Sequence, residues 1–366
     1  MKFFKHATFW IFLIVWASRI FKLSLIIKNG LLTDFNTYFL AVNNLFNKSQ
    51  NIDLVLKASY GPPFVFLPFL IFINWSFKTA EIIFTAVNIL AYFFSFYLLW
   101  KIYLKKITWL FWLLISLMSY SFPLIFSLGM GNPIGIVTLG IYSLFIVKNK
   151  FLKRFLFTVS SLIKIFPASV LIAFTDKKKE ILNCLLFFTS GLMLSLVILP
   201  KDIWPRYLLW FNQFNPANTT YVNPLIYNQS FSSTLVRFIG SNQYSSLYYY
   251  LLILALFIIG GIFFFKYKIT RYNRLDSMIF YLSLSLLIHP FPWQYYFAVL
   301  LPYLVLQTGF KRYYNLIPMF LISIDGNRFI GTGFIKYFLD GSQFFGTLIL
   351  IVILFFNVFK YKNINI

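Results

Sequence analysis

Residues 79–100, TAEIIFTAVNILAYFFSFYLLW, form an apolar stretch with one charged residue, Glu81. At a helical rise of about 1.5 Å per residue, a stretch of this length crosses the roughly 30 Å hydrocarbon core of a bilayer. Similar runs recur along the chain of 366 residues, of which 60% are apolar, 22% aromatic and only 11% charged. Soluble globular proteins carry about 25% charged residues. The sequence therefore predicts an all-α polytopic membrane protein.

The apolar runs predict about twelve transmembrane helices within one transmembrane domain, residues 1–366. The run 62–74 is short for a span, and we interpret it as a re-entrant or interfacial helix. A full crossing there would move the cluster Lys101 to Lys106 to the opposite side of the membrane. The predicted spans lie near residues 7–27, 79–100, 107–123, 132–147, 154–164, 167–175, 181–199, 247–265, 276–288, 294–308, 313–324 and 343–359.

The charge balance, 32 Lys and Arg against 9 Asp and Glu, predicts the orientation. A net charge of +23 on a soluble chain would suggest nucleic acid, but here the basic residues flank the apolar runs, as they do on the cytoplasmic side of membrane proteins. Both termini are then expected inside. The longest polar segments, 28–60, 200–246 and 325–342, fall on the outer face. We therefore expect no nucleic-acid partner and an active site on the outer face of the cytoplasmic membrane.

The first outer loop, residues 28–78, contains apolar residues at helical spacing within a polar background. This pattern is typical of an amphipathic juxtamembrane helix that lies along the membrane surface. Residues 200–246 form the second long outer loop. These two loops are where the sequence concentrates polar side chains that could act on a substrate.

Asp34 is the candidate catalytic residue, at the start of this amphipathic segment in Thr33-Asp34-Phe35. An acid at such a place is often a helix cap or a first-turn residue. Its place beside the outer boundary also suits a general base that takes a proton from a sugar hydroxyl. The residues leave both interpretations open.

Three basic residues are candidates for binding a donor phosphate or lipid: Lys164, Arg237 and His289. Lys164 lies among apolar residues just before Pro167, where a charge is costly unless it snorkels or binds an anion. Arg237 offers a planar fork that suits phosphate. His289 links two predicted spans on the outer face, and the alternative to phosphate binding is a purely structural role.

Amides and aromatic rings are the side chains that recognise sugars by hydrogen bonding and stacking. The candidate substrate-binding residues are Tyr38, Tyr60, Asn132, Asn228, Gln229 and Trp293. The sequence contains no phosphate-binding loop, no dinucleotide fingerprint and no His-Glu-x-x-His motif. We expect no metal site and no cofactor.

Six motifs in order resemble glycosyltransferase family 87, within the GT-C class of membrane glycosyltransferases. The resemblance extends over about residues 30–305, and Met130 stands where the family usually has Gln. The motifs are Thr33-Asp34-Phe35-Asn36-Thr37-Tyr38, Tyr60-Gly61-Pro62-Pro63, Gly129-Met130-Gly131-Asn132, Lys164 with Pro167, Asn228-Gln229-Ser230 followed by Arg237, and the loop His289 to Tyr296.

The resemblance implies an inverting transferase with a GT-C type helical bundle. Such an enzyme moves a hexose, mannose above all, or a pentose such as arabinofuranose from a polyprenyl-phosphate donor to a lipid-linked or cell-surface glycan acceptor. The family's base corresponds to Asp34. The alternative is a polytopic transporter or lipid flippase, which would share the bundle and the intramembrane charges.

Overall fold

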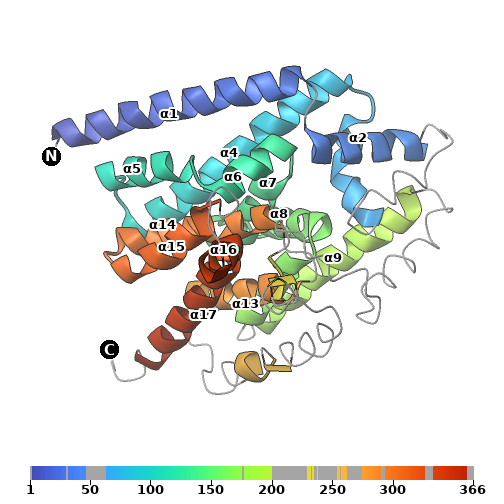
Figure 1. Cartoon of the computed structure of the whole chain (residues 1–366). Coiled ribbons are helices and arrows are strands. Elements are labelled where there is room, and N and C mark those ends of the chain that lie inside the picture. The colour runs from blue at the N-terminus through green and yellow to red at the C-terminus, as the bar shows by residue number, and fades with distance from the viewer. Residues whose placement is uncertain are drawn as a thin grey trace. The chain divides into compact units, whose positions relative to one another are not determined.

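The computed structural model describes the chain as a set of helices (Figure 1). Two compact units are distinguished, and each is treated by itself. Unit 1 comprises Met1–Ser119, Leu124–Pro167 and Leu182–Gln213, and unit 2 comprises Tyr120–Pro123, Ala168–Ile181 and Phe214–Ile366. The structure describes residues 2–29, 32–46, 63–174, 177–199, 229–231, 233–234, 237, 254–255, 257–261, 274–289, 293–325 and 333–360. Within these ranges there is no strand, as the sequence predicts.

Unit 1 is built around α7, which packs against α4 on one side and α8 on another. Gly140 of α7 permits the close approach to α8, since a Cβ there would collide with Ser160. Ser160 Oγ in turn donates to the carbonyl oxygen of Val137 at 3.0 Å. The helices lying wholly or mostly in unit 1 are α1 (Lys2–Lys28), α2 (Thr33–Phe46), η1 (Pro63–Phe72), α4 (Phe77–Leu104), α5 (Trp109–Met118), α6 (Phe122–Met130), α7 (Ile134–Ile146), α8 (Lys150–Ile163) and α9 (Lys178–Ile198).

Unit 2 is centred on α17, which packs against α13 and α15. Leu350 and Leu354 of α17 are fully buried there, as is Ile322 of α15. The described helices lying wholly or mostly in unit 2 are η2 (Phe166–Phe174), α13 (Arg274–Ile288), η5 (Gln294–Leu300), α14 (Leu301–Gly309), η6 (Tyr313–Asn315), α15 (Leu316–Ser323), α16 (Gly333–Asp340) and α17 (Ser342–Lys360).

Three of the described helices are long and apolar enough to span a membrane: α1 from Ala7 to Lys28, α4, and α9. A fourth span results if the bent pair α5 and α6 counts as one. Other predicted spans correspond to shorter helices, such as α7 and α13. The prediction of several apolar helices is thus confirmed, whereas the number of about twelve spans stays a prediction.

The single span predicted at 107–123 is wrong in detail. The structure divides this region into α5 and α6, which meet at an angle of 59°. Pro123 is the second residue of α6, and a proline cannot continue a preceding helix because it lacks the backbone N–H. Ser119, at the break, turns its hydroxyl back to the carbonyl oxygen of Ser116 at 2.6 Å.

The stretch interpreted as re-entrant or interfacial is a 3₁₀ helix, η1, of 10 residues with Pro68 inside it. A 3₁₀ helix rises about 2.0 Å per residue, so η1 extends roughly 20 Å, which is shorter than the hydrocarbon core. Its length therefore favours a re-entrant or interfacial helix over a full crossing.

Candidate active site

Helix α2 carries the candidate base at its N-terminal end. Phe35 is fully buried, and its ring stacks on Phe84 of α4 with the centroids 4.6 Å apart. Leu32, just before the helix, is fully buried too. These apolar anchors fix the start of α2, and they leave Asp34 half-buried in the first turn.

Asn132 reaches the Asp34 carboxylate from a distant part of the chain. Its Nδ2 donates to Oδ2 of Asp34 at 2.8 Å. The turn between α6 and α7 makes this possible, because Gly131 adopts a φ of +69°, a conformation that favours glycine. A Cβ at Gly131 would lie 2.8 Å from the Cβ of Phe35, so the turn and α2 approach closely only with glycine there.

A second amide, Asn88 of α4, holds this turn in place. Its Nδ2 donates to the carbonyl oxygen of Asn132 at 2.7 Å, and its Oδ1 accepts from the N–H of Ile136 at 3.2 Å. Asn88 and Asn132 are both buried. The sequence analysis missed Asn88, although a lone amide inside the apolar run 79–100 is a signal that could have pointed to it.

Tyr38 lies one helical turn after Asp34, and its hydroxyl accepts a hydrogen bond from Nζ of Lys164 at 3.3 Å. Its ring stacks on Phe69 of η1 with the centroids 4.5 Å apart and the planes at 14°. Lys164 directly follows α8 in extended conformation, and its own N–H closes the helix on the carbonyl oxygen of Ser160. Helix α8 thus ends just before Lys164, the residue whose side chain contacts Tyr38 of α2.

Unit 1 therefore brings four of the predicted site residues together in one polar row: Asn132, Asp34, Tyr38 and Lys164. Met130, the residue that departs from the family pattern, lies next to this row, since Oγ1 of Thr33, the residue before Asp34, is 3.4 Å from its sulfur. The first-turn position of Asp34 agrees with a favourable interaction with the helix dipole. The contact with Asn132 gives the carboxylate a partner that a simple cap would not require.

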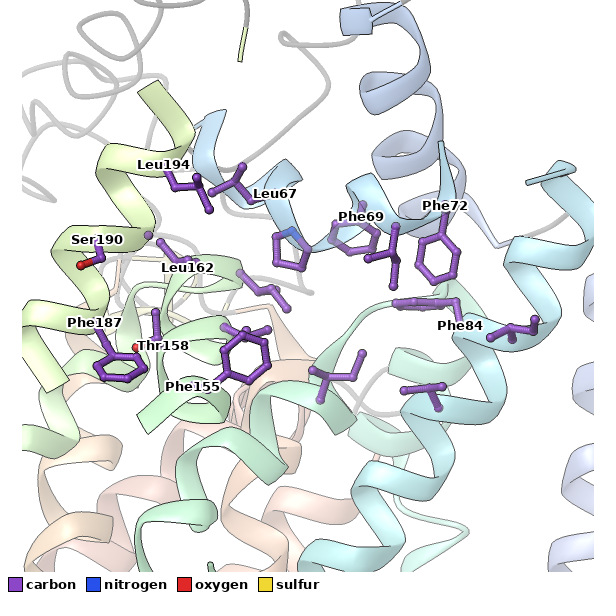
Figure 2. Close-up of a pocket in the computed structure, with 18 of the residues that line it drawn as sticks. Leu67, Phe69, Phe72, Phe84, Phe155, Thr158, Leu162, Phe187, Ser190 and Leu194 are labelled. Atoms are coloured by element: carbon purple, nitrogen blue, oxygen red, sulfur yellow. The ribbon is translucent and has the colours of Figure 1, made fainter. Parts of the chain in front are cut away.

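An apolar cavity of about 560 Å³ lies beside this row, and Figure 2 shows residues that line the cavity. Residues of η1, α4, α8 and α9 surround it, and nearly all of them are apolar. They include Leu67, Phe72, Phe84, Phe155, Leu162 and Leu194.

Three contacts connect the cavity with the polar row. Phe69 lines the cavity and stacks on Tyr38. Ile163 lines it and directly precedes Lys164. Phe84 lines it and stacks on Phe35, the neighbour of Asp34. The polar row and the apolar cavity are thus adjacent within unit 1.

The remaining described candidates belong to unit 2. The Gln229 side chain is fully buried; its Nε2 donates to the carbonyl oxygen of Asp340 at 2.7 Å, and its Oε1 accepts from the N–H of Phe344 at 3.4 Å. This amide joins its segment to the junction of α16 and α17.

Arg237 has an acidic neighbour that the sequence analysis did not identify, Asp340. Burial lowers the pKa of the Arg237 guanidinium to about 10, and the carboxylate of Asp340 opposes this shift. Burial raises the pKa of Asp340, against the effect of Arg237 and Lys336. Arg237 remains protonated at neutral pH, and its Nη2 donates to Thr234 Oγ1 at 3.1 Å.

His289 directly follows α13, and its ring meets Tyr296 edge-on with the centroids 5.7 Å apart. Trp293 precedes η5, and its ring is parallel to that of Tyr295. Both side chains are half-buried. Tyr60 and Asn228 lie outside the described residues. Within the part of the chain that is described, no group of three or more His, Cys, Asp or Glu could hold a metal ion.

Long apolar helices, with a polar row beside an apolar cavity in unit 1, are the features of a helical membrane protein with a candidate active site. The model of glycosyltransferase family 87 matches residues 60–291, more than half of the chain, and the chain belongs to that family. It is therefore a membrane glycosyltransferase, which decides against the transporter or flippase. Asp34 and Tyr38 precede the matched residues. No curated protein and no solved structure was found to match.

Proposed function

We propose that this protein transfers a sugar from a polyprenyl-phosphate donor to a lipid-linked or cell-surface glycan acceptor, with inversion, on the outer face of the cytoplasmic membrane. The observation that carries the proposal is the Asp34–Asn132 hydrogen bond beside an apolar cavity. The sugar is a hexose, with mannose as the first candidate, or a pentose.

Asp34 acts as the general base in this proposal. It takes the proton of the acceptor hydroxyl while that oxygen forms a bond to C1 of the sugar. The bond from C1 to the phosphate oxygen breaks on the opposite face, and polyprenyl phosphate leaves with the electron pair. One carboxylate is enough because the leaving phosphate needs little protonation, unlike glycoside hydrolysis, which uses two.

Lys164 is the candidate in unit 1 for the donor phosphate. Lys164 directly follows Ile163, which lines the cavity, and its ammonium group donates to the Tyr38 hydroxyl. A cation there would stabilise the charge of the leaving phosphate, and the cavity would take part of the isoprenoid chain. Arg237 and His289 belong to unit 2, and their part in holding the phosphate stays a prediction, as do the sugar contacts of Tyr60, Asn228, Gln229 and Trp293.

The test compares wild type with Asp34→Asn in membranes incubated with radiolabelled polyprenyl-phosphate sugars. Asparagine keeps the size of the side chain, and its carbonyl oxygen can still accept from Asn132, but it is not a base. We expect transfer to fall by about 10²–10⁴-fold, the usual contribution of a general base. Asp53→Asn, in the same predicted outer loop, is the matched control and should remain active.

Wild-type turnover by Asp34→Asn at saturating donor would contradict the assigned base. Absence of label transfer from every polyprenyl-phosphate sugar, with transfer from another activated sugar, would contradict the donor class instead.

A further inference from the structure

A second cavity, of about 140 Å³, lies between α1, α4 and α6 of unit 1. It is separate from the cavity beside Asp34, and the two share no lining residue. Its apolar lining includes Ile89, Leu124 and Leu128. The break between α5 and α6 borders it, since Ser119 is among the lining residues.

The polar side of this cavity is formed by three residues of α1: Trp16, Arg19 and Lys22. They follow one another at intervals of three residues and so lie along one side of the helix. The indole Nε1 of Trp16 is buried and has no hydrogen-bond partner among the described residues. The hydroxyl of Ser119 is already used, as a donor to Ser116. The lining therefore offers N–H donors and two positive charges, and it includes no carboxylate.

The position of these charges in α1 requires an explanation. The helix is a candidate membrane span from Ala7 to Lys28, and most of it is exposed on the surface of the protein. Cations inside a span are costly unless they reach water or an anion. A lipid with an anionic headgroup would bring such an anion to Arg19 and Lys22 from the bilayer itself.

We propose that this cavity binds the headgroup of an anionic phospholipid, with Arg19 and Lys22 on its phosphate and Trp16 donating to a headgroup oxygen. The acyl chains then run over the apolar surface of α1, where Ile14 is 68% exposed and Ile20 52% exposed. The small volume suits a headgroup, whereas the cavity of about 560 Å³ suits a prenyl chain.

Such a lipid would connect α1 with the turn that supplies Asn132. Leu128 and Gly129 line the cavity, and Asn132 follows them by only a few residues. The bound phospholipid would hold α1 against the end of α6 and so support the contact between Asn132 and Asp34. The binding site itself does not depend on the proposed reaction.

The experiment measures binding of short-chain phosphatidylglycerol to the full chain in detergent, by native mass spectrometry and by the shift in melting temperature. We compare wild type, Arg19→Gln/Lys22→Gln, and Lys28→Gln, which removes an exposed cation of the same helix outside the cavity. Each lost charge-assisted hydrogen bond should weaken binding by about tenfold or more. The double variant should therefore bind at least about a hundredfold more weakly, and Lys28→Gln should bind as wild type does.

A second measurement locates the lipid without removing a charge. Phosphatidylglycerol with brominated chains should quench a fluorescence component that is absent from Trp16→Phe. Equal binding by the double variant, equal stabilisation by phosphatidylcholine or inorganic phosphate, or tighter competition by a polyprenyl phosphate at this cavity would each overturn the proposal.

Discussion

Replacing Asn132 tests whether the orientation of the Asp34 carboxylate matters for catalysis. In Asn132→Ala, the 2.8 Å hydrogen bond to Asp34 is lost. The turn should remain, because the backbone oxygen of Asn132 accepts from Asn88 and its N–H donates to Ser127. A hydrogen bond to a charged group contributes about 1.5–3 kcal/mol. At about 1.4 kcal/mol per factor of ten, kcat should fall roughly 10- to 150-fold.

Asn132→Asp is the more discriminating variant, because it keeps the shape of the side chain but replaces the amide donor with a carboxylate. A second carboxylate would face Asp34 at hydrogen-bond distance, and two such groups share one proton rather than ionise together. Asp34 would then be a poor base. We expect a larger loss than in Asn132→Ala, approaching the roughly 10²–10⁴-fold loss of a missing base.

The assay is the initial rate of sugar transfer at saturating donor and acceptor, with the melting temperature in detergent measured alongside. Asn36→Ala, at an asparagine of α2, serves as the control and should retain wild-type turnover. If Asn132→Asp melted normally and turned over at the wild-type rate, the Asp34–Asn132 pair would have no catalytic role and the reasoning would fail.

Three further outcomes are expected. Gly131→Ala should lower the melting temperature and the activity, since a positive φ costs a residue with a side chain about 1–2 kcal/mol and the new Cβ would contact Phe35. Gly129→Ala is the control and should be neutral, because its Cβ would lie 3.9 Å from the nearest side chain. Equal effects of the two variants would contradict this account. Tyr38→Phe keeps the ring stack but removes the acceptor for the Lys164 ammonium, so turnover should fall about 10- to 150-fold, the effect of one hydrogen bond to a charged group, with unchanged melting; wild-type turnover would exclude the hydroxyl from the mechanism. Cysteines introduced at positions 47 and 178 should react with an impermeant thiol reagent from opposite sides of the membrane, because basic residues concentrate inside; labelling from one side would refute the topology.

The sequence predicted the helices well where the signal is local. The apolar run 79–100 became α4, and the amphipathic segment that begins at Asp34 became α2, because hydropathy and spacing report directly on a helix. The break between α5 and α6 was missed, since an apolar run gives no sign of a bend and only Pro123 marks it. The number of spans depends on such bends, and composition alone does not reveal them.

The residues of the polar row were among the predicted site residues, but their contacts with one another were not predicted. Asp34 and Asn132 are 98 positions apart, and Tyr38 and Lys164 are 126 apart. No spacing rule connects positions so distant, and the family motifs give their order rather than their contacts. The sequence analysis also missed Asn88 as a neighbour of this site and Asp340 as a neighbour of Arg237. The reason is the same, because these contacts form only when distant segments pack together.

In the reaction proposed above, the polar row separates two tasks that would interfere if they shared one position. A base beside a cation would be held in its ionised form and would accept a proton poorly. Asn132 orients Asp34 with a neutral donor, while the cation of Lys164 meets Tyr38, one turn further along α2 and so about 5.4 Å along its axis. That division suits inversion, in which a base serves the incoming hydroxyl and a positive charge serves the phosphate leaving from the other face of the sugar. In the same proposal, the apolar cavity beside the row meets the third requirement, a space for the lipid that carries the phosphate.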